Sequence, residues 1–186
     1  MARVYIVHGF GASPSDHWFQ WLKGALEREG AQVCVLAMPD SSEPELPKWV
    51  SHLGRQVGGQ ENCLFIGHSL GCITLLHFLS NSFRGEIAGL ILVSPFDQKL
   101  ENRPIMDSFT RARPDYSELK RRCNQSFVFA SDNDSIIPVD LSKKVSEKLA
   151  AEFILVRSAG HFLASDGFCE FFELLDPCMK VLKSSN

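Results

Sequence analysis

The chain has 186 residues, of which 45% are hydrophobic and 22% are charged, and its formal net charge is −3 at pH 7. These values predict one globular domain over residues 1–186, large enough to bury a sizeable core. The slight negative charge gives no reason to expect nucleic acid or a membrane surface as a partner, and no run approaches the roughly 18 apolar residues that a membrane helix requires.

Apolar, β-branched runs alternate with helical patterns along the whole chain. The expected strands are Arg3–Val7, Gln32–Ala37, Asn62–Ile66, Ile87–Val93, Ser126–Ala130 and Glu152–Val156. The helical patterns cover about His17–Arg28, Leu46–Val57, Gly71–Ser82, Tyr116–Arg122, Val139–Ala150 and Gly167–Lys183. Near-continuous hydrophobicity is typical of strands buried on both faces of a parallel sheet. The order predicts an α/β fold, doubly wound, with a mostly parallel six-stranded sheet and helices on both faces.

The amino terminus has no charged leader before an apolar stretch, because Ala2–Val7 already has the pattern of a core strand. The six cysteines are spread along the chain, without a C-x-x-C pair or a Cys/His metal spacing. We therefore expect a cytoplasmic protein with reduced thiols and no bound metal.

The segment Gly67-His68-Ser69-Leu70-Gly71 is a G-x-S-x-G motif between a strand-like run and a helix-like run. A nucleophile elbow needs this strand-turn-helix context, because its glycines let the two elements approach closely while the serine hydroxyl is presented above the sheet. We predict that Ser69 is a nucleophile. The alternative is an ordinary Gly-rich connection.

A serine nucleophile needs a base and a third group that orients the base. His161 is the predicted base, because it follows the last strand in a short loop with a glycine before it. For His68, inside the motif, we expect only a packing role. The loop after Ser126–Ala130 offers two candidate acids, Asp132 and Asp134. The non-catalytic role expected of Asp132 is to form a turn or a cap through a hydrogen bond between its side chain and the backbone.

The oxyanion formed during acyl transfer needs two backbone N–H donors. Leu70, directly after Ser69, supplies one in this prediction, and Phe10 in the loop after the first strand supplies the other. A phosphate-binding glycine loop is the weaker interpretation of that loop, because it lacks G-x-G-x-x-G and the lysine of a P-loop.

The aromatic residues near the first loop allow two interpretations. Trp18 belongs to a cluster that favours core packing against the sheet. The alternative is a pocket wall beside the oxyanion loop, for which His8 and Trp18 are the candidates. Residues 94–115 have no clean period, and they are expected either to border the pocket as a lid or to form a surface excursion.

Together these motifs resemble the α/β-hydrolase superfamily over essentially the full length. Within it the chain is similar to the small serine hydrolases related to retinoblastoma-binding protein 9, especially the bacterial ones, in V-Y-I-V-H-G-F, S-P-S-D-H-W-F-Q-W-L, G-H-S-L-G, D-N-D-S-I-I-P and the late G-H. The resemblance implies a three-layer α/β-hydrolase fold with little or no lid. It also favours Asp134 over Asp132, so that Ser69, Asp134 and His161 are the implied nucleophile, acid and base.

The expected activity is hydrolysis of a small carboxylic ester or related acyl compound, with a small-molecule acyl substrate and no cofactor. Cleavage of an amide, peptide or thioester by the same residues is one alternative. A protein-binding module that has the fold without catalysis is another. The retinoblastoma-binding motif L-x-C-x-E is absent from the sequence.

Overall fold

The computed structural model describes residues 2–59, 61–101 and 103–184. Within them six strands form one sheet in the order β2-β1-β3-β4-β5-β6, and each neighbouring pair is parallel. β2 lies on one side of β1, and the later strands are added in order on the other side, so the order of strand addition reverses at β1. Ligands of such sheets bind near this reversal, beyond the carboxyl ends of the strands. The strands are β1 (Arg3–Val7), β2 (Gln32–Leu36), β3 (Cys63–His68), β4 (Ile87–Val93), β5 (Ser126–Ser131) and β6 (Glu152–Val156).

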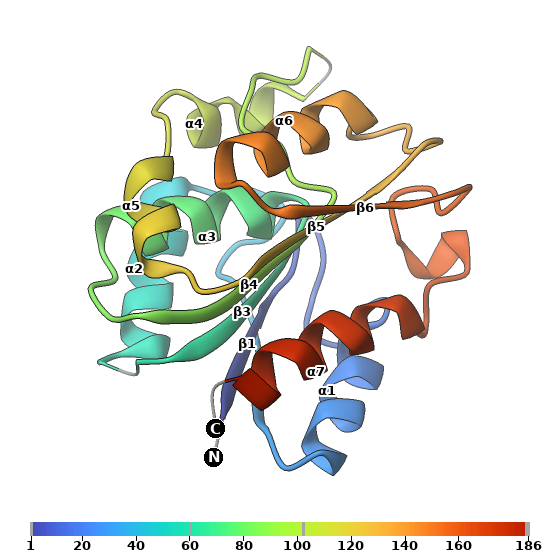
Figure 1. The fold of residues 1–186 in the computed structure, drawn as a ribbon. Coiled ribbons are helices and arrows are strands. Elements are labelled where there is room, and N and C mark those ends of the chain that lie inside the picture. Colours follow the sequence, from blue (N-terminus) through green and yellow to red (C-terminus); the bar gives the residue numbers. More distant parts are fainter. Residues whose placement is uncertain (1, 60, 102, 185–186) are drawn as a thin grey trace.

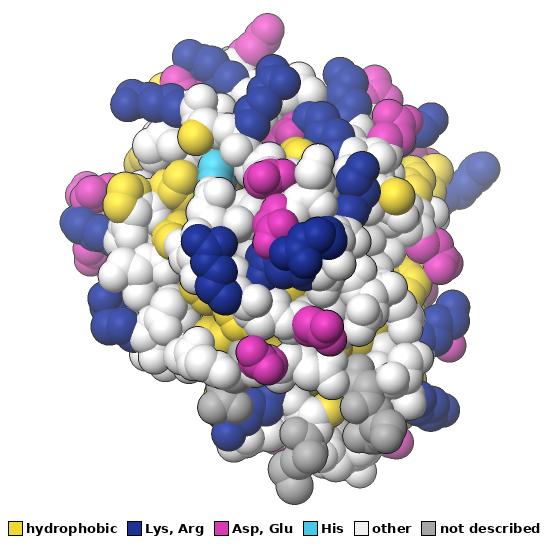
Figure 2. Space-filling view, turned by 60° about the vertical axis from the view of Figure 1, so that its left-hand side comes forward, with side chains coloured by type: hydrophobic (Ala, Val, Ile, Leu, Met, Phe, Trp, Pro, Cys, Tyr) yellow, Lys and Arg dark blue, Asp and Glu magenta, His cyan; other side chains and the backbone are white. Residues whose placement is uncertain are grey.

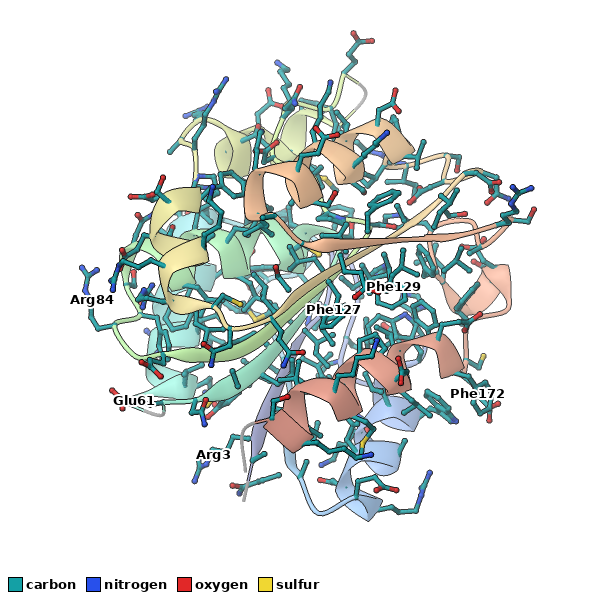
Figure 3. The ribbon with its side chains drawn as sticks, viewed as in Figure 1. Arg3, Glu61, Arg84, Phe127, Phe129 and Phe172 are labelled. Atoms are coloured by element: carbon teal, nitrogen blue, oxygen red, sulfur yellow. The ribbon has the colours of Figure 1, made fainter. Side chains whose placement is uncertain are left out.

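Helices cover both faces of the sheet (Figure 1). On one face lie α1 (Phe19–Arg28) and α7 (Leu175–Ser184), and on the other lie α2 (Leu46–Val57), α3 (Leu70–Asn81), α5 (Tyr116–Arg122) and α6 (Val139–Leu149). A buried apolar cluster fills the space on each side. Figure 3 shows Phe127 and Phe129 of β5 projecting toward α7, in the same cluster as Cys178. The predicted three-layer α/β arrangement is therefore present.

Two helices begin later than their sequence patterns predict. α1 begins at Phe19 rather than His17, because His17 has a φ of 52°, which lies outside the helical region. α7 begins at Leu175 rather than near Gly167, which has a φ of 95°. The stretch before α7 instead contains two 3₁₀ turns, Ala164–Asp166 and Phe172–Leu174.

The long connection after β4 contains short helical turns. A 3₁₀ turn at Pro104–Met106 leads into α4 (Asp107–Thr110). His77 of α3 donates its Nε2–H to the carbonyl oxygen of Phe109 at 3.0 Å, which anchors the connection to α3. Part of the segment 94–115 borders the cavity described below, and residue 102 lies outside the described residues.

Among the helices in the described part of the chain, none combines the length and the apolar character that a membrane span requires. On the face shown in Figure 2, Lys and Arg side chains are interspersed with Asp and Glu side chains.

Candidate active site

Ser69 occupies a strained turn between β3 and α3. Its φ of 52° and ψ of −117° lie outside the regions that L residues ordinarily adopt, and such strain is concentrated at functional sites. The turn requires both flanking glycines: a Cβ on Gly67 would lie 2.9 Å from Cα of Cys72, and a Cβ on Gly71 would lie 2.3 Å from the carbonyl oxygen of Val7. The local structure is the strand-turn-helix of a nucleophile elbow.

His161 and Asp134 form a buried pair. The Nδ1–H of His161 donates a hydrogen bond of 2.7 Å to Oδ2 of Asp134, and 6% and 1% of the two side chains are exposed. Because Nδ1 carries the proton in this pairing, Nε2 is the basic nitrogen of the neutral ring. His161 and Ser69 line the same cavity. The structure thus brings together the three residues for which the sequence predicts catalytic roles.

Three further hydrogen bonds hold the carboxylate of Asp134. Its Oδ1 accepts the backbone N–H groups of Ile136 and Ile137 at 2.8 and 2.9 Å, and its Oδ2 accepts the hydroxyl of Ser94 at 2.8 Å. Burial acts to raise the pKa of Asp134, but the hydrogen bonds from His161 and the two backbone N–H groups outweigh it, and the pKa lies below its ordinary value. Asp134 is therefore ionised at neutral pH.

Asp132 supports the backbone instead of the imidazole ring. Its Oδ1 accepts the backbone N–H of Ser158 at 2.8 Å. The side chains on either side of Asp132 accept the next two backbone N–H groups of the same loop, at 2.9 and 2.8 Å. The end of β5 thus holds the loop that leads to His161. Of the two candidate acids, Asp134 contacts the ring.

His68 has a role that the sequence analysis missed. It lines the cavity, and its Nε2–H donates to the backbone carbonyl oxygen of His161 at 2.9 Å. Burial, followed by the nearby His161, holds the pKa of His68 well below its ordinary value, so the ring is neutral. The position of His68 directly before Ser69 was the one sequence signal of such a role. The hydrogen bond could not be predicted from it, because the partner, His161, lies far along the chain.

The two predicted oxyanion donors belong to segments that adjoin Ser69. Leu70 is the first residue of α3, where backbone N–H groups have no partner within the helix. On the other side runs the loop after β1, and a Cβ on Gly9 would lie 3.1 Å from Cβ and 3.6 Å from Oγ of Ser69. Phe10, the next residue of this loop, lines the cavity.

His8 supports this loop from behind, and its predicted place in the pocket wall is corrected. Its Nδ1–H donates to the carbonyl oxygen of Gly9 at 2.9 Å, and its Nε2 accepts the N–H of Met38 at 3.1 Å. Only 1% of His8 is exposed. These bonds connect the loop after β1 to the chain segment after β2.

Trp18 is a core residue, and its alternative place in the pocket wall is likewise corrected. It is 0% exposed and packs edge-on against Phe19 and Phe171, with ring centroids 4.6 and 5.7 Å apart. The large apolar area of the indole is buried in the cluster between the sheet and the α1/α7 layer.

A cavity of about 110 Å³ lies beside Ser69. Its wall includes three histidines and several apolar side chains: His17, His68, His161, Phe10, Met106, Ile136 and Leu163. A groove of about 680 Å³ shares Arg103 and Ile136 with this wall and therefore adjoins the cavity. Sequence reasoning did not identify Arg103 and Met106, because their segment has no periodicity.

The groups at the cavity are a hydroxyl, imidazole rings, a carboxylate and backbone N–H groups. This set is suited to nucleophilic acyl transfer with stabilisation of an oxyanion. Within the described residues, no cluster of three or more His, Cys, Asp and Glu side chains is placed to hold a metal ion.

Comparison with known proteins adds independent information. A family model described as serine hydrolase matches residues 4–177. The protein YdeN of Bacillus subtilis (strain 168) is 37% identical over 168 residues, which cover 89% of this chain and 88% of YdeN. The serine hydrolase RBBP9 of Rattus norvegicus is 26% identical over 179 residues, covering 95% and 90% of the two chains.

Solved structures agree with the fold. The crystal structure of the ydeN gene product from B. subtilis superposes with a TM-score of 0.94 at 32% identity, covering 98% of this chain and 100% of that one. A carboxylesterase structure from Nitrososphaera gargenis superposes with a TM-score of 0.71 at 13% identity, covering 99% and 90%. At that identity the second likeness shows the fold alone. The three-layer architecture is that of the α/β-hydrolases.

Proposed function

The chain belongs to the serine hydrolase family, and on this premise we propose that it hydrolyses small carboxylic esters through a triad of Ser69, His161 and Asp134. One observation carries the proposal: a buried imidazole, bound to a carboxylate at 2.7 Å, borders the same cavity as a serine in the elbow conformation. This arrangement can make a serine hydroxyl nucleophilic without a cofactor.

In the first half-reaction, Nε2 of His161 takes the proton of Ser69 while Oγ attacks the carbonyl carbon of the ester. Asp134 keeps the ring oriented through Nδ1–H and balances the imidazolium charge. The N–H groups of Leu70 and Phe10 bind the oxyanion. His161 then gives its proton to the departing alkoxide, and the acyl group stays on Ser69. Water, deprotonated by the same imidazole, releases the carboxylic acid and restores the hydroxyl.

The volume of the cavity supports short acyl groups. An apolar cavity of about 150 Å³ holds one benzene molecule, so a cavity of about 110 Å³ has room for about four non-hydrogen atoms. The acyl group remains attached to Ser69 beside the loop after β1. The leaving group is protonated by His161. It can extend into the groove of about 680 Å³, which shares Arg103 and Ile136 with the cavity wall. We therefore assign the acyl group to the cavity and the alcohol to the groove.

Amides, peptides and thioesters react through the same steps, so they are the alternative substrates. Esters are preferred over amides and peptides because an alkoxide leaves more readily than an amine nitrogen, which the single general acid must protonate as the bond breaks. Thioesters, whose thiolate also leaves readily, are separated from esters by the substrate panel described below. We also propose that the protein acts in the cytoplasm. All six cysteines, each within the described residues, are free thiols, as is usual in a reducing compartment.

A fluorophosphonate probe, which labels activated serines, tests the proposal. We expect labelling of the wild-type protein and a loss of labelling in Ser69→Ala and His161→Ala. If the wild type is not labelled, or if Ser69→Ala is labelled equally well, the hydrolase mechanism is wrong and a binding module on this fold becomes the better explanation. A panel of nitrophenyl ester, amide and thioester substrates then separates the ester from its alternatives.

A further inference from the structure

The tautomer of His17 is set by a backbone hydrogen bond. Nδ1 of His17 accepts the N–H of Ala164 at 3.0 Å. A backbone N–H can only donate, so Nδ1 is unprotonated, and the proton of the neutral ring is on Nε2. Burial is the largest influence on the pKa of His17 and lowers it, although the nearby Asp16 acts in the opposite direction. At neutral pH the ring therefore has an Nε2–H donor.

His17 is part of the wall of the reaction cavity. It lines this cavity with Ser69 and His161 and is half-buried. Its ring centroid lies 5.8 Å from that of His68 and 5.5 Å from that of Phe19, so the ring is packed on two sides. Its φ of 52° is uncommon for a residue with a side chain.

The other histidines near the cavity use their ring protons within the protein. His161 donates to Asp134, His68 donates to the carbonyl oxygen of His161, and His8 donates to the loop after β1. His17 differs in kind, because its bond to Ala164 uses the lone pair of Nδ1 and leaves the ring proton for another acceptor. A group bound in the cavity can provide that acceptor.

We infer that His17 is a substrate-binding residue whose Nε2–H donates to an acceptor oxygen on the acyl group, so that the preferred substrates are esters of short acids with a hydroxyl, ether or keto oxygen. This inference rests on the proposed ester hydrolysis. The remaining wall is largely apolar, with Phe10, Met106 and Leu163 among its residues. A mostly apolar pocket with a few placed polar groups is the usual design of a small-molecule site.

Two esters of equal size test the inference. Nitrophenyl methoxyacetate has an ether oxygen where nitrophenyl butyrate has a methylene. We compare the ratio of the two kcat/KM values between the wild type and each variant, because the difference in intrinsic reactivity of the two esters is the same for every variant and therefore cancels. His17→Asn keeps an acceptor for the N–H of Ala164 and tolerates a φ of 52°, but its amide is too short to donate where Nε2 does. His17→Gln places an amide N–H near the position of Nε2 and gives up the bond to Ala164.

We expect the methoxyacetate-to-butyrate ratio to fall about tenfold in His17→Asn, the size of one neutral hydrogen bond, and to be largely retained in His17→Gln. An unchanged ratio in His17→Asn overturns the inference, since it leaves His17 only the role of holding Ala164. A wild-type protein that is not labelled by the fluorophosphonate overturns the proposed function itself. If the wild type is labelled but the methoxyacetate-to-butyrate ratio is the same in the wild type and in both His17 variants, the inference about His17 is wrong and the proposed ester hydrolysis stands.

Discussion

The side chain of His68 donates a hydrogen bond of 2.9 Å to the backbone carbonyl oxygen of His161. It joins the residue directly before the proposed nucleophile to the proposed base, so the positions of Ser69 and His161 are coupled through two buried groups. His68 is 2% exposed and His161 is 6% exposed, and water cannot readily replace this bond.

Replacing His68 with Leu should weaken both stability and turnover. The carbonyl oxygen of His161 would be left buried without its donor, at a cost of about 1–3 kcal/mol in the free energy of unfolding. We expect kcat to fall about tenfold, because a small displacement of the base has a large effect on proton transfer. His68→Gln, which can restore an N–H donor near Nε2, should recover most of the loss. Urea unfolding and steady-state kinetics measure both effects, and equal kcat values for the two variants would contradict the argument.

Asp134→Asn should reduce kcat by a factor on the order of 10⁴, as expected when the acid of a Ser-His-Asp triad becomes an amide and the wrong imidazole tautomer is favoured. Asp132→Asn is the matched control, because its remaining amide oxygen can still accept the N–H of Ser158. We expect that control to retain turnover within severalfold. An equal loss in both variants would show that the assignment of the acid is wrong.

The lowered pKa of Asp134 predicts how its contribution to stability depends on pH. A carboxyl group with a lower pKa in the folded than in the unfolded state stabilises the fold above its unfolded pKa of about 4, and that contribution is lost as the pH falls through the folded pKa. The wild type should therefore lose free energy of unfolding more steeply than Asp134→Asn as the pH falls below about 4. Urea titrations between about pH 2.5 and 7 measure the difference, and parallel curves would contradict the predicted pKa direction.

Ser94 is expected to position Asp134. It is 0% exposed, and its hydroxyl donates to Oδ2 of Asp134 at 2.8 Å. Ser94→Ala should raise the pKa of Asp134 and lower kcat by about two- to tenfold through the loss of one hydrogen bond. The control is Ser142→Ala, which removes a buried hydroxyl that donates to the carbonyl oxygen of Pro95. Its kcat should be close to that of the wild type, and similar kcat losses in the two variants would point to a general packing effect.

Met106 should limit the length of the acyl chain. It is 4% exposed and lines the cavity of about 110 Å³. Across a series of nitrophenyl esters, the wild-type kcat/KM should decline beyond the butyryl ester, and in Met106→Ala the optimum should move by about two carbons, the volume that the truncation opens. Met38→Ala truncates another buried methionine, 6% exposed, and should leave the optimum unchanged. An optimum that stays in place in Met106→Ala would contradict the acyl assignment of the cavity.

Local sequence patterns predict most of the sheet. The predicted bounds of Ile87–Val93 and Glu152–Val156 match β4 and β6, since a run of apolar residues between turn signals marks a strand without knowledge of its neighbours. The expected burial holds for β4, which is buried throughout, but not for β6, which lies at the edge of the sheet and has no buried residue. The predicted helix starts at His17 and near Gly167 are wrong because both residues have a positive φ, which hydrophobic periodicity does not report. The strand order, β2-β1-β3-β4-β5-β6, appears only in the tertiary structure.

For the site, local patterns predict the chemical groups and their order along the chain: Ser69 in its motif, then Asp132 or Asp134, and then His161, each after a strand. The choice of Asp134 over Asp132 came from the family resemblance. Which groups meet depends on the packed fold. Packing joined His17 to Ala164, placed Met106 in the cavity wall, and buried His8 behind the loop after β1. A motif consists of residues that are neighbours in the sequence. Burial, tautomer and cavity shape depend instead on atoms that become adjacent only after the sheet and its loops have packed.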